Sequence, residues 1–244
     1  MNHINGIIRR ELQSYFATPI AYVFIVIFLV MSGVFAFYFG SLYERGQADL
    51  LPFFNYHPWL YLFLVPAVAM RVWSEERNSG NIELLMTLPV KRLTWVIGKF
   101  LAAWLFVGLA LLLTFPLVIS INYLGDPDNG VILASYFGSF LLAGAFLAIG
   151  SCLSAATKNQ VIAFILTVVI CFLFLLSGFP MVLSFFQLFL PQFMVDVVAS
   201  TSFLSHYASI TKGVLDLGDL SYFALTICIW LYATVLVVEM KKGD

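Results

Sequence analysis

The residues best suited to chemistry in water gather in one stretch of the chain, from position 71 to position 99. Eight of the chain's 25 charged side chains (12 Lys and Arg, 13 Asp and Glu) lie there. Because charge is scarce elsewhere, we expect this stretch to make the main aqueous contacts on its side of the molecule. Its charged members are Arg71, Glu75, Glu76, Arg77, Glu83, Lys91, Arg92 and Lys99.

The sequence does not indicate catalysis. A phosphate-binding loop has Ser or Thr directly after its lysine, and no lysine of this chain is followed by either. His3, His57 and His206 lack the H-E-x-x-H spacing of a zinc protease. The Leu-Gly-Asp triplets at 124–126 and 217–219 are explained by turns and helix caps. We therefore expect no enzyme activity and no cofactor in this chain, and we expect energy to come from another subunit.

Composition indicates an integral membrane protein. The chain is 62% apolar and 10% charged, and its mean hydropathy is +0.99. The net charge of −1 gives no indication of nucleic-acid binding. Cys152, Cys171 and Cys228 all fall in apolar runs, where cysteine behaves as a small apolar residue. No disulfide or metal framework is implied.

A helix needs roughly 20 mostly apolar residues to cross the hydrocarbon core of a bilayer. Six segments of this chain are long and apolar enough to do so. An apolar run at 181–190 is too short to cross and is bracketed by Pro180 and Pro191, so we interpret it as a re-entrant or interfacial helix. The predicted spans are Pro19–Gly40, Phe54–Trp73, Thr94–Tyr123, Val131–Ala156, Gln160–Gly178 and Leu220–Val238. The sequence therefore predicts an all-α membrane protein.

Basic residues predict the orientation of these spans, because they are retained on the cytoplasmic side. With the amino terminus inside, only Arg45 and Lys212 among the 12 Lys and Arg residues lie outside. Both termini are then cytoplasmic. Residues 1–18 place apolar side chains at helical spacing, which predicts an amphipathic helix on the inner membrane surface.

No ionisable residue is evident in the middle of a predicted span, where proton-coupled transporters usually carry one. Arg71 and Lys99 lie near inner span ends, from which long side chains can reach the headgroups. Trp73 is expected at the membrane interface, with the helix continuing into water after it. On the fourth span, small residues at positions 144, 148, 151 and 155 predict a close internal packing face.

A second amphipathic helix is predicted between the second and third spans. Asn78, Ser79 and Gly80 are expected to end the preceding helix. Residues 81–88 then place Ile82, Leu85 and Met86 on one face, and Pro89 ends the pattern. The alternative is a loop that rests its apolar face on lipid.

These residues carry a family resemblance. Glu75-x-Arg77-x-x-Gly80-x-x-Glu83-x-Leu85, then Pro89 and Gly98-Lys99, resembles the cytoplasmic signature of ABC-2 type transporter permeases. The likeness extends over nearly the whole chain. Residues 15–22, 66–90 and 203–223 are most similar to the gliding-motility-associated subgroup of these permeases, in the bacterial inner membrane.

The resemblance implies one ABC-2 type domain over residues 1–244, with an interfacial helix at 1–18 and a coupling helix at 74–90 that docks on a separate ATPase subunit. It implies two permease subunits on two ATPase subunits, with ATP and Mg²⁺ bound by the ATPase. The implied coupling residues are Glu75, Glu76, Arg77, Gly80, Ile82, Glu83, Leu85, Met86 and Pro89.

The resemblance also implies that an outer segment, residues 179–213, forms re-entrant helices that cap the pathway, with Pro180, Pro191, His206 and Lys212 in the outer gate. Two functions remain open. One is ATP-driven export of a substrate that the sequence does not identify. The other is a mechanotransmission subunit that moves no solute and relays ATPase motion to a periplasmic or membrane partner.

Overall fold

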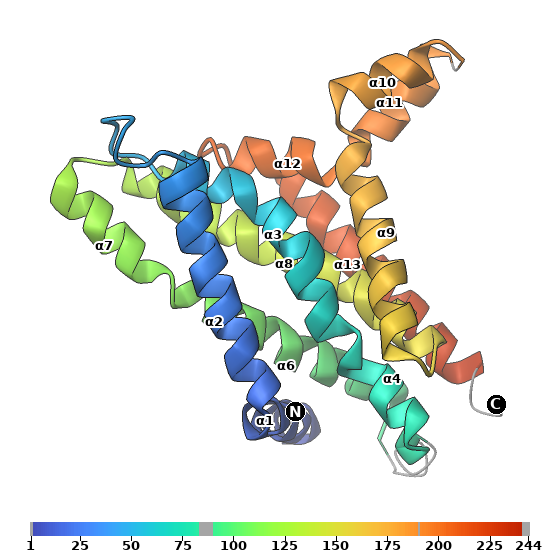
Figure 1. Ribbon diagram of the computed structural model, residues 1–244. Helices are drawn as coiled ribbons and strands as arrows, with labels where there is room; N and C mark the ends of the chain where they lie inside the picture. The colour runs from blue at the N-terminus through green and yellow to red at the C-terminus, as the bar shows by residue number, and fades with distance from the viewer. Residues whose placement is uncertain (1, 83–89, 190, 241–244) are drawn as a thin grey trace.

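The chain folds into a bundle of helices (Figure 1), as the apolar periodicity predicts. The computed structural model describes residues 2–82, 90–189 and 191–240. Within these ranges every regular element is a helix and there is no strand. The all-α class is therefore confirmed.

The described residues form a series of helices along the chain. They are α1 (Asn2–Ala17), α2 (Pro19–Val34) with its π-helical continuation η1 (Phe35–Phe39), α3 (Leu51–Ala69), α4 (Arg71–Asn78), α6 (Arg92–Leu112), α7 (Phe115–Leu124), α8 (Asn129–Ala156), α9 (Gln160–Leu176), α10 (Pro180–Gln187), α11 (Gln192–Ser200), α12 (Phe203–Ile210) and α13 (Leu217–Met240).

Four helical segments among the described residues are long and apolar enough to cross a membrane: 19–39, 92–124, 129–156 and 217–240. A fifth span results if α9 and α10, which meet at a bend of 77°, count as one broken span. The predicted second span coincides with α3, but Asn55, His57 and two internal prolines lower its hydropathy. Six spans therefore remain a prediction.

Helix α8 is the centre of the bundle, where it contacts α3, α6, α9 and α13. The most apolar 18-residue window of α8 is 72% buried. Gly144, Ala148, Ser151 and Ala155 are all buried, and a methyl group on Gly144 would lie 2.8 Å from the Trp104 ring. The internal packing face predicted for this helix is confirmed, because only small side chains leave room for such close neighbours.

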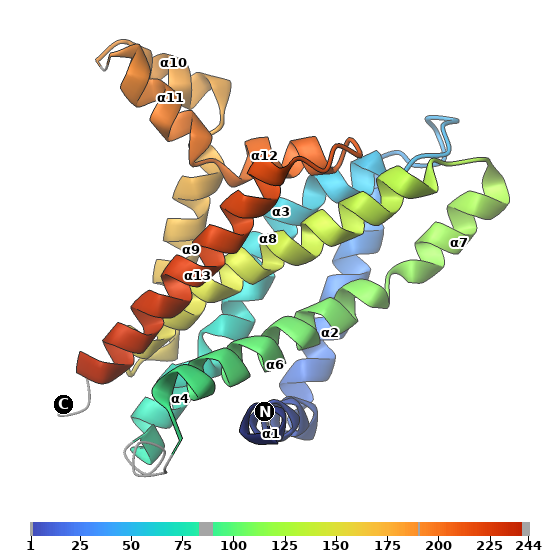
Figure 2. The same ribbon diagram turned by 180° about the vertical axis from the view of Figure 1, so that it is seen from behind.

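Helix α1 lies across one end of the bundle and packs along α6 (Figure 2). Gly98 permits this approach, since a Cβ there would lie only 2.7 Å from Cγ2 of Ile7. Further along, the Tyr15 ring stacks on Phe106 with centroids 5.3 Å apart. The last described residue of α13 lies at the same end as α1 (Figures 1 and 2), which agrees with an even number of spans.

At the opposite end, α10 and α11 pair with each other and project away from the bundle, whereas α12 packs on α8, α9 and α13 (Figure 1). Phe203, Tyr207 and Ile210 bury α12 in the core. In contrast, α10 has no buried residue. The outer segment therefore has two parts, a packed helix and a projecting hairpin.

Candidate functional site

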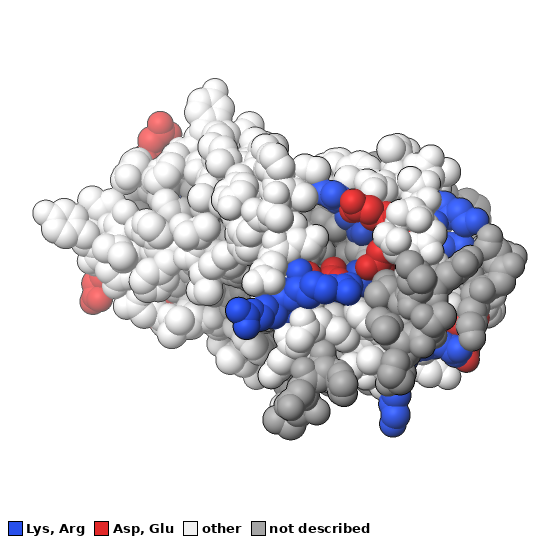
Figure 3. Space-filling model, turned by 90° about the horizontal axis from the view of Figure 1, so that it is seen from below, with Lys and Arg blue, Asp and Glu red and all other residues white. Residues whose placement is uncertain are grey.

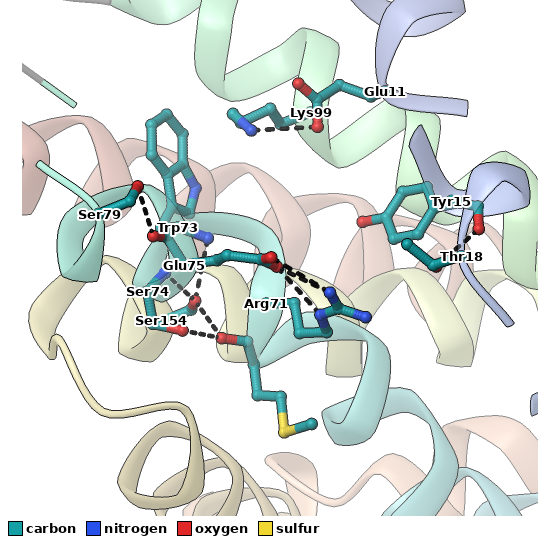
Figure 4. Close-up of polar contacts among 11 residues, drawn as sticks. Glu11, Tyr15, Thr18, Arg71, Trp73, Ser74, Glu75, Ser79, Lys99 and Ser154 are labelled. Carbon is teal, nitrogen blue, oxygen red and sulfur yellow. Dashed lines mark hydrogen bonds and ion pairs between the residues drawn. The ribbon is translucent and has the colours of Figure 1, made fainter. Parts of the chain in front are cut away.

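Helix α4 begins directly after a break in the helical chain at Met70. The hydroxyl of Ser154, on α8, lies at this break and accepts from the amides of Trp73 (3.1 Å) and Ser74 (3.0 Å). The same hydroxyl donates to the Met70 carbonyl at 2.8 Å. The first amides of a helix lack intrahelical partners. Ser154 thus acts as an N-cap supplied from another helix (Figure 4).

Two further contacts hold α4 against the end of α8. The indole Nε1 of Trp73 donates to Ser151 Oγ at 3.1 Å, and Arg77 Nη1 donates to the Ala155 carbonyl at 2.8 Å. Carbonyls in the last turn of a helix lack intrahelical donors and attract cations. Trp73 is 1% exposed and Arg77 7%. The helix continues past Trp73 as expected, but the face of α4 that carries Ser74 and Arg77 is buried in the protein and not in water.

The adjacent residues Glu75 and Glu76 point to different partners. Glu75 accepts two hydrogen bonds from Arg71 of the same helix, at 3.0 and 3.2 Å, and its side chain is 53% exposed. Glu76 instead pairs with Lys99 of α6 at 2.8 Å, and its side chain is 18% exposed. Burial raises the pKa of the Glu76 carboxyl, and the Lys99 ammonium opposes this rise.

Lys99 does not extend toward the headgroups as expected, because its side chain is only 3% exposed. Its ammonium lies 3.1 Å from a carboxylate oxygen of Glu11, on α1 (Figure 4), and 5.4 Å from the centroid of the Trp73 ring. We call Lys99, Glu11, Glu76 and Trp73 the Lys99 cluster. It joins α1, α4 and α6.

The coupling segment, residues 74–90, begins within α4. Helix α4 ends at Asn78, and Gly80 has a φ of 73°, in the left-handed region that favours glycine. Ile82 is partly buried against the main core. The remaining predicted coupling residues, Glu83, Leu85, Met86 and Pro89, lie outside the described residues.

Charged side chains gather on the end of the molecule that carries α1 and α4. Viewed from that end, Lys, Arg, Asp and Glu lie together on one part of the surface, while much of the rest is uncharged (Figure 3). Arg92, at the start of α6, pairs there with Glu239 near the end of α13. The elements that precede and follow the coupling segment are therefore tied to the bundle by polar contacts.

The structure places the predicted outer-gate residues on different elements. Pro180 begins α10 and Pro191 precedes α11. On α12, His206 Nδ1 lies 2.6 Å from an Asp219 carboxylate oxygen of α13. Lys212 lines a cavity of about 330 Å³ that Asp49 and Asp128 also line. The four residues thus lie on or beside three different helices, and their role in an outer gate stays a prediction.

Some polar contacts had no signal in the sequence patterns. The Tyr207 hydroxyl donates to the Phe54 carbonyl at 2.9 Å and lies 2.8 Å from Ser139 Oγ, which is 3.3 Å from His57 Nδ1. His57 is 1% exposed, so α3 carries a buried ionisable residue near the start of the predicted second span. The sequence signal for the serines of α8 is their spacing of three or four residues within an apolar helix.

Comparison with known proteins assigns the chain to a family. A sequence model described as "ABC-2 family transporter protein" matches residues 63–239. This range includes α4, the coupling segment, Lys99 and the outer helices. A search of curated proteins found no match. Proteins of such permease families are generally non-catalytic, multi-pass membrane subunits that work with an ABC ATPase. The chain belongs to the ABC-2 transporter family.

Proposed function

We propose that this chain is the transmembrane permease subunit of an ABC-2 transporter, coupling ATP hydrolysis by a separate ATPase subunit to export of a substrate. Two permease subunits pack on two ATPase subunits, which bind the ATP and Mg²⁺. The coupling segment faces the cytoplasm and contacts the ATPase. Both termini lie in the cytoplasm of a cell whose inner membrane holds the complex.

The observation that carries this proposal is the attachment of α4, within a chain that belongs to the family. The helix that leads into the coupling segment contacts α8 through Ser151, Ser154 and Ala155. Because α8 is the most buried helix of the candidate spans, a push on the coupling segment reaches the centre of the bundle. This attachment is what a subunit moved by an external ATPase requires.

The direct test is purification of the tagged chain from its native membranes in mild detergent. We expect mass spectrometry to identify an ABC ATPase in the complex, and we expect ATP hydrolysis by the complex but not by the chain alone. A second copy of the chain or a homologous permease should be present too. Tight ATP binding by the isolated chain, or a complex without any ATPase, would overturn the proposal.

The same preparation separates export from mechanotransmission. A permease that exports a solute requires no large extracytoplasmic partner in stoichiometric amount. A subunit that relays motion requires one. We expect the lipid bilayer, the ATPase and the permeases to be sufficient for activity in proteoliposomes, and a strict requirement for a periplasmic or membrane auxiliary subunit would favour mechanotransmission.

A further inference from the structure

The Lys99 cluster shares Trp73 with the contacts that hold α4 on α8, while its ion pairs link α4 to α6 and α1. Lys99 is on α6, near the point where α1 crosses that helix, and it contacts two carboxylates from two other helices. Gly98, the residue before it, admits the Ile7 side chain of α1 at close range. The approach of α1 to α6 therefore positions Glu11 beside the ammonium group.

The two ion pairs of Lys99 are largely buried. The side chains of Glu11 and Glu76 are 15% and 18% exposed, while that of Lys99 is 3% exposed. A buried charge that loses its partner is strongly unfavourable, whereas an exposed pair contributes little. The neighbouring pair Arg71–Glu75 is of the exposed kind and lies within a single helix. Unlike that pair, the ion pairs of Lys99 connect different helices.

The cluster is also connected to α8. The Lys99 ammonium lies over the ring of Trp73, and the Trp73 indole donates to Ser151. A displacement of α4 therefore changes the surroundings of Lys99 and, through Glu11, those of α1.

We propose that Lys99 is a positioning residue for energy coupling: it holds α4 in a fixed position relative to α1, so that movement of the coupling segment is passed to the amino-terminal helix as well as to α8. The inference rests on the proposed function for the source of that movement. Its structural part, the fixed position of α1 relative to α4, is a property of the chain alone.

The test measures the distance between α1 and α4 by electron–electron double resonance, with spin labels on cysteines at Gly6 and Asn78, both exposed. Cys228→Ser removes the exposed native cysteine, and Cys152 and Cys171 are buried. Replacing Lys99 alone would remove the ion-pair partner of the buried Glu76 carboxylate and leave Glu11 paired with the exposed Arg10. The test variant is therefore the neutral triple Glu11→Gln, Lys99→Met and Glu76→Gln, and the matched control is Glu75→Gln.

In the isolated chain, we expect one narrow distance distribution for the parent protein and for Glu75→Gln, and loss of the narrow peak in the neutral triple variant at an unchanged unfolding temperature. Glu76→Gln alone, a milder variant, should widen the distribution less. In the purified complex with its ATPase, the triple variant should lose the stimulation of ATP turnover that the parent chain gives.

A narrow, unshifted peak in both the triple variant and Glu76→Gln would overturn the inference and leave the proposed function intact. A widened peak with fully retained stimulation of ATP turnover would also overturn it, because α1 would then be positioned without a role in coupling. Failure of any ATPase to join the complex would instead contradict the proposed function, and the distance measurement on the isolated chain would be unaffected.

Discussion

At the residue scale, single polar side chains on helices far apart in the sequence determine how α4 is held. Ser154 caps α4 from 80 and 81 positions away, and Lys99 meets Glu11 across 88 positions. Each contact satisfies or pairs a group that would be costly if buried alone. The residues that position the coupling segment are therefore not the exposed charges that first draw attention to it.

The cap from Ser154 predicts a measurable cost. In Ser154→Ala, the amides of Trp73 and Ser74 and the carbonyl of Met70 lose a buried hydroxyl partner. We expect a destabilisation of about 1–3 kcal/mol, measured as thermal or denaturant unfolding in detergent.

The control for this variant is Ser184→Ala, which removes an exposed serine that bonds only a carbonyl of its own turn. We expect no measurable change in the free energy of unfolding of Ser184→Ala. Equal stabilities of the two variants would contradict the role of Ser154.

The sequence alone predicts residue types near the site but not their burial. The turn at Gly80 follows from local backbone preference, and its positive φ confirms it. Burial of Trp73, Arg77 and Lys99 depends on partners supplied by other helices. No periodicity within residues 71–99 contains that information, so these side chains were expected in water or at the interface.

At the element scale, the apolar runs of the chain predict most helices because lipid-facing and core-facing positions are both apolar. Helix α3 is the exception, since its sequence includes Asn55, His57 and internal prolines although 12 of its 19 residues are buried. The buried His57 is tolerated there because its Nδ1 lies 3.3 Å from the Ser139 hydroxyl. Hydropathy therefore predicts α2, α8 and α13 better than it predicts α3.

The contact between α1 and α6 gives a second prediction. In Gly98→Ala the added methyl group meets Ile7 at Cγ2 (2.7 Å) and Cβ (3.1 Å), so the helices must separate. We expect the free energy of unfolding to fall by about 1–3 kcal/mol, as for other overpacked cores. The measurement is unfolding in detergent.

Two variants control for helix propensity and for specificity. Gly33→Ala should be neutral or stabilising, because no atom lies within 4 Å of the added methyl group. Ile7→Ala combined with Gly98→Ala should recover part of the stability that Gly98→Ala loses. If Gly33→Ala and Gly98→Ala change the free energy of unfolding equally, the close approach of α1 to α6 does not contribute to stability.

At the scale of the whole molecule, the two ends of the bundle expose different kinds of side chain. The end that carries α1, α4 and Met240 displays the clustered Lys, Arg, Asp and Glu side chains (Figure 3). The opposite end carries the projecting α10–α11 hairpin, whose exposed side chains include Met181, Phe185 and Phe193. Basic residues favour the cytoplasmic side, so we expect the first end to face the cytoplasm.

Cysteine labelling tests this orientation. With Cys228 replaced, an impermeant thiol reagent added to intact cells should label cysteines at Gly46 and Ser205 but not at Asn78 or Lys158. Labelling of all four sites after the membrane is opened is the control for accessibility. Labelling at position 158 from outside would contradict the six-span arrangement.

The most direct test of the central claim, that the coupling segment connects this chain to an ATPase, is Leu85→Asp. Burying one apolar side chain contributes about 1.5–3 kcal/mol, against roughly 0–1 for an exposed ion pair. A loss of that size weakens binding by roughly 10- to 100-fold. The predicted face of Ile82, Leu85 and Met86 should therefore matter more to docking than any single charge.

The measurement is the amount of ATPase that co-purifies with the tagged chain at equal expression. Met240→Asp, which changes a 73% exposed apolar residue at the same end of the molecule, is the matched control. We predict that Leu85→Asp inserts into the membrane normally and loses its ATPase, while Met240→Asp keeps it. Full recovery of a coupled ATPase with Leu85→Asp would contradict the assignment of the coupling segment.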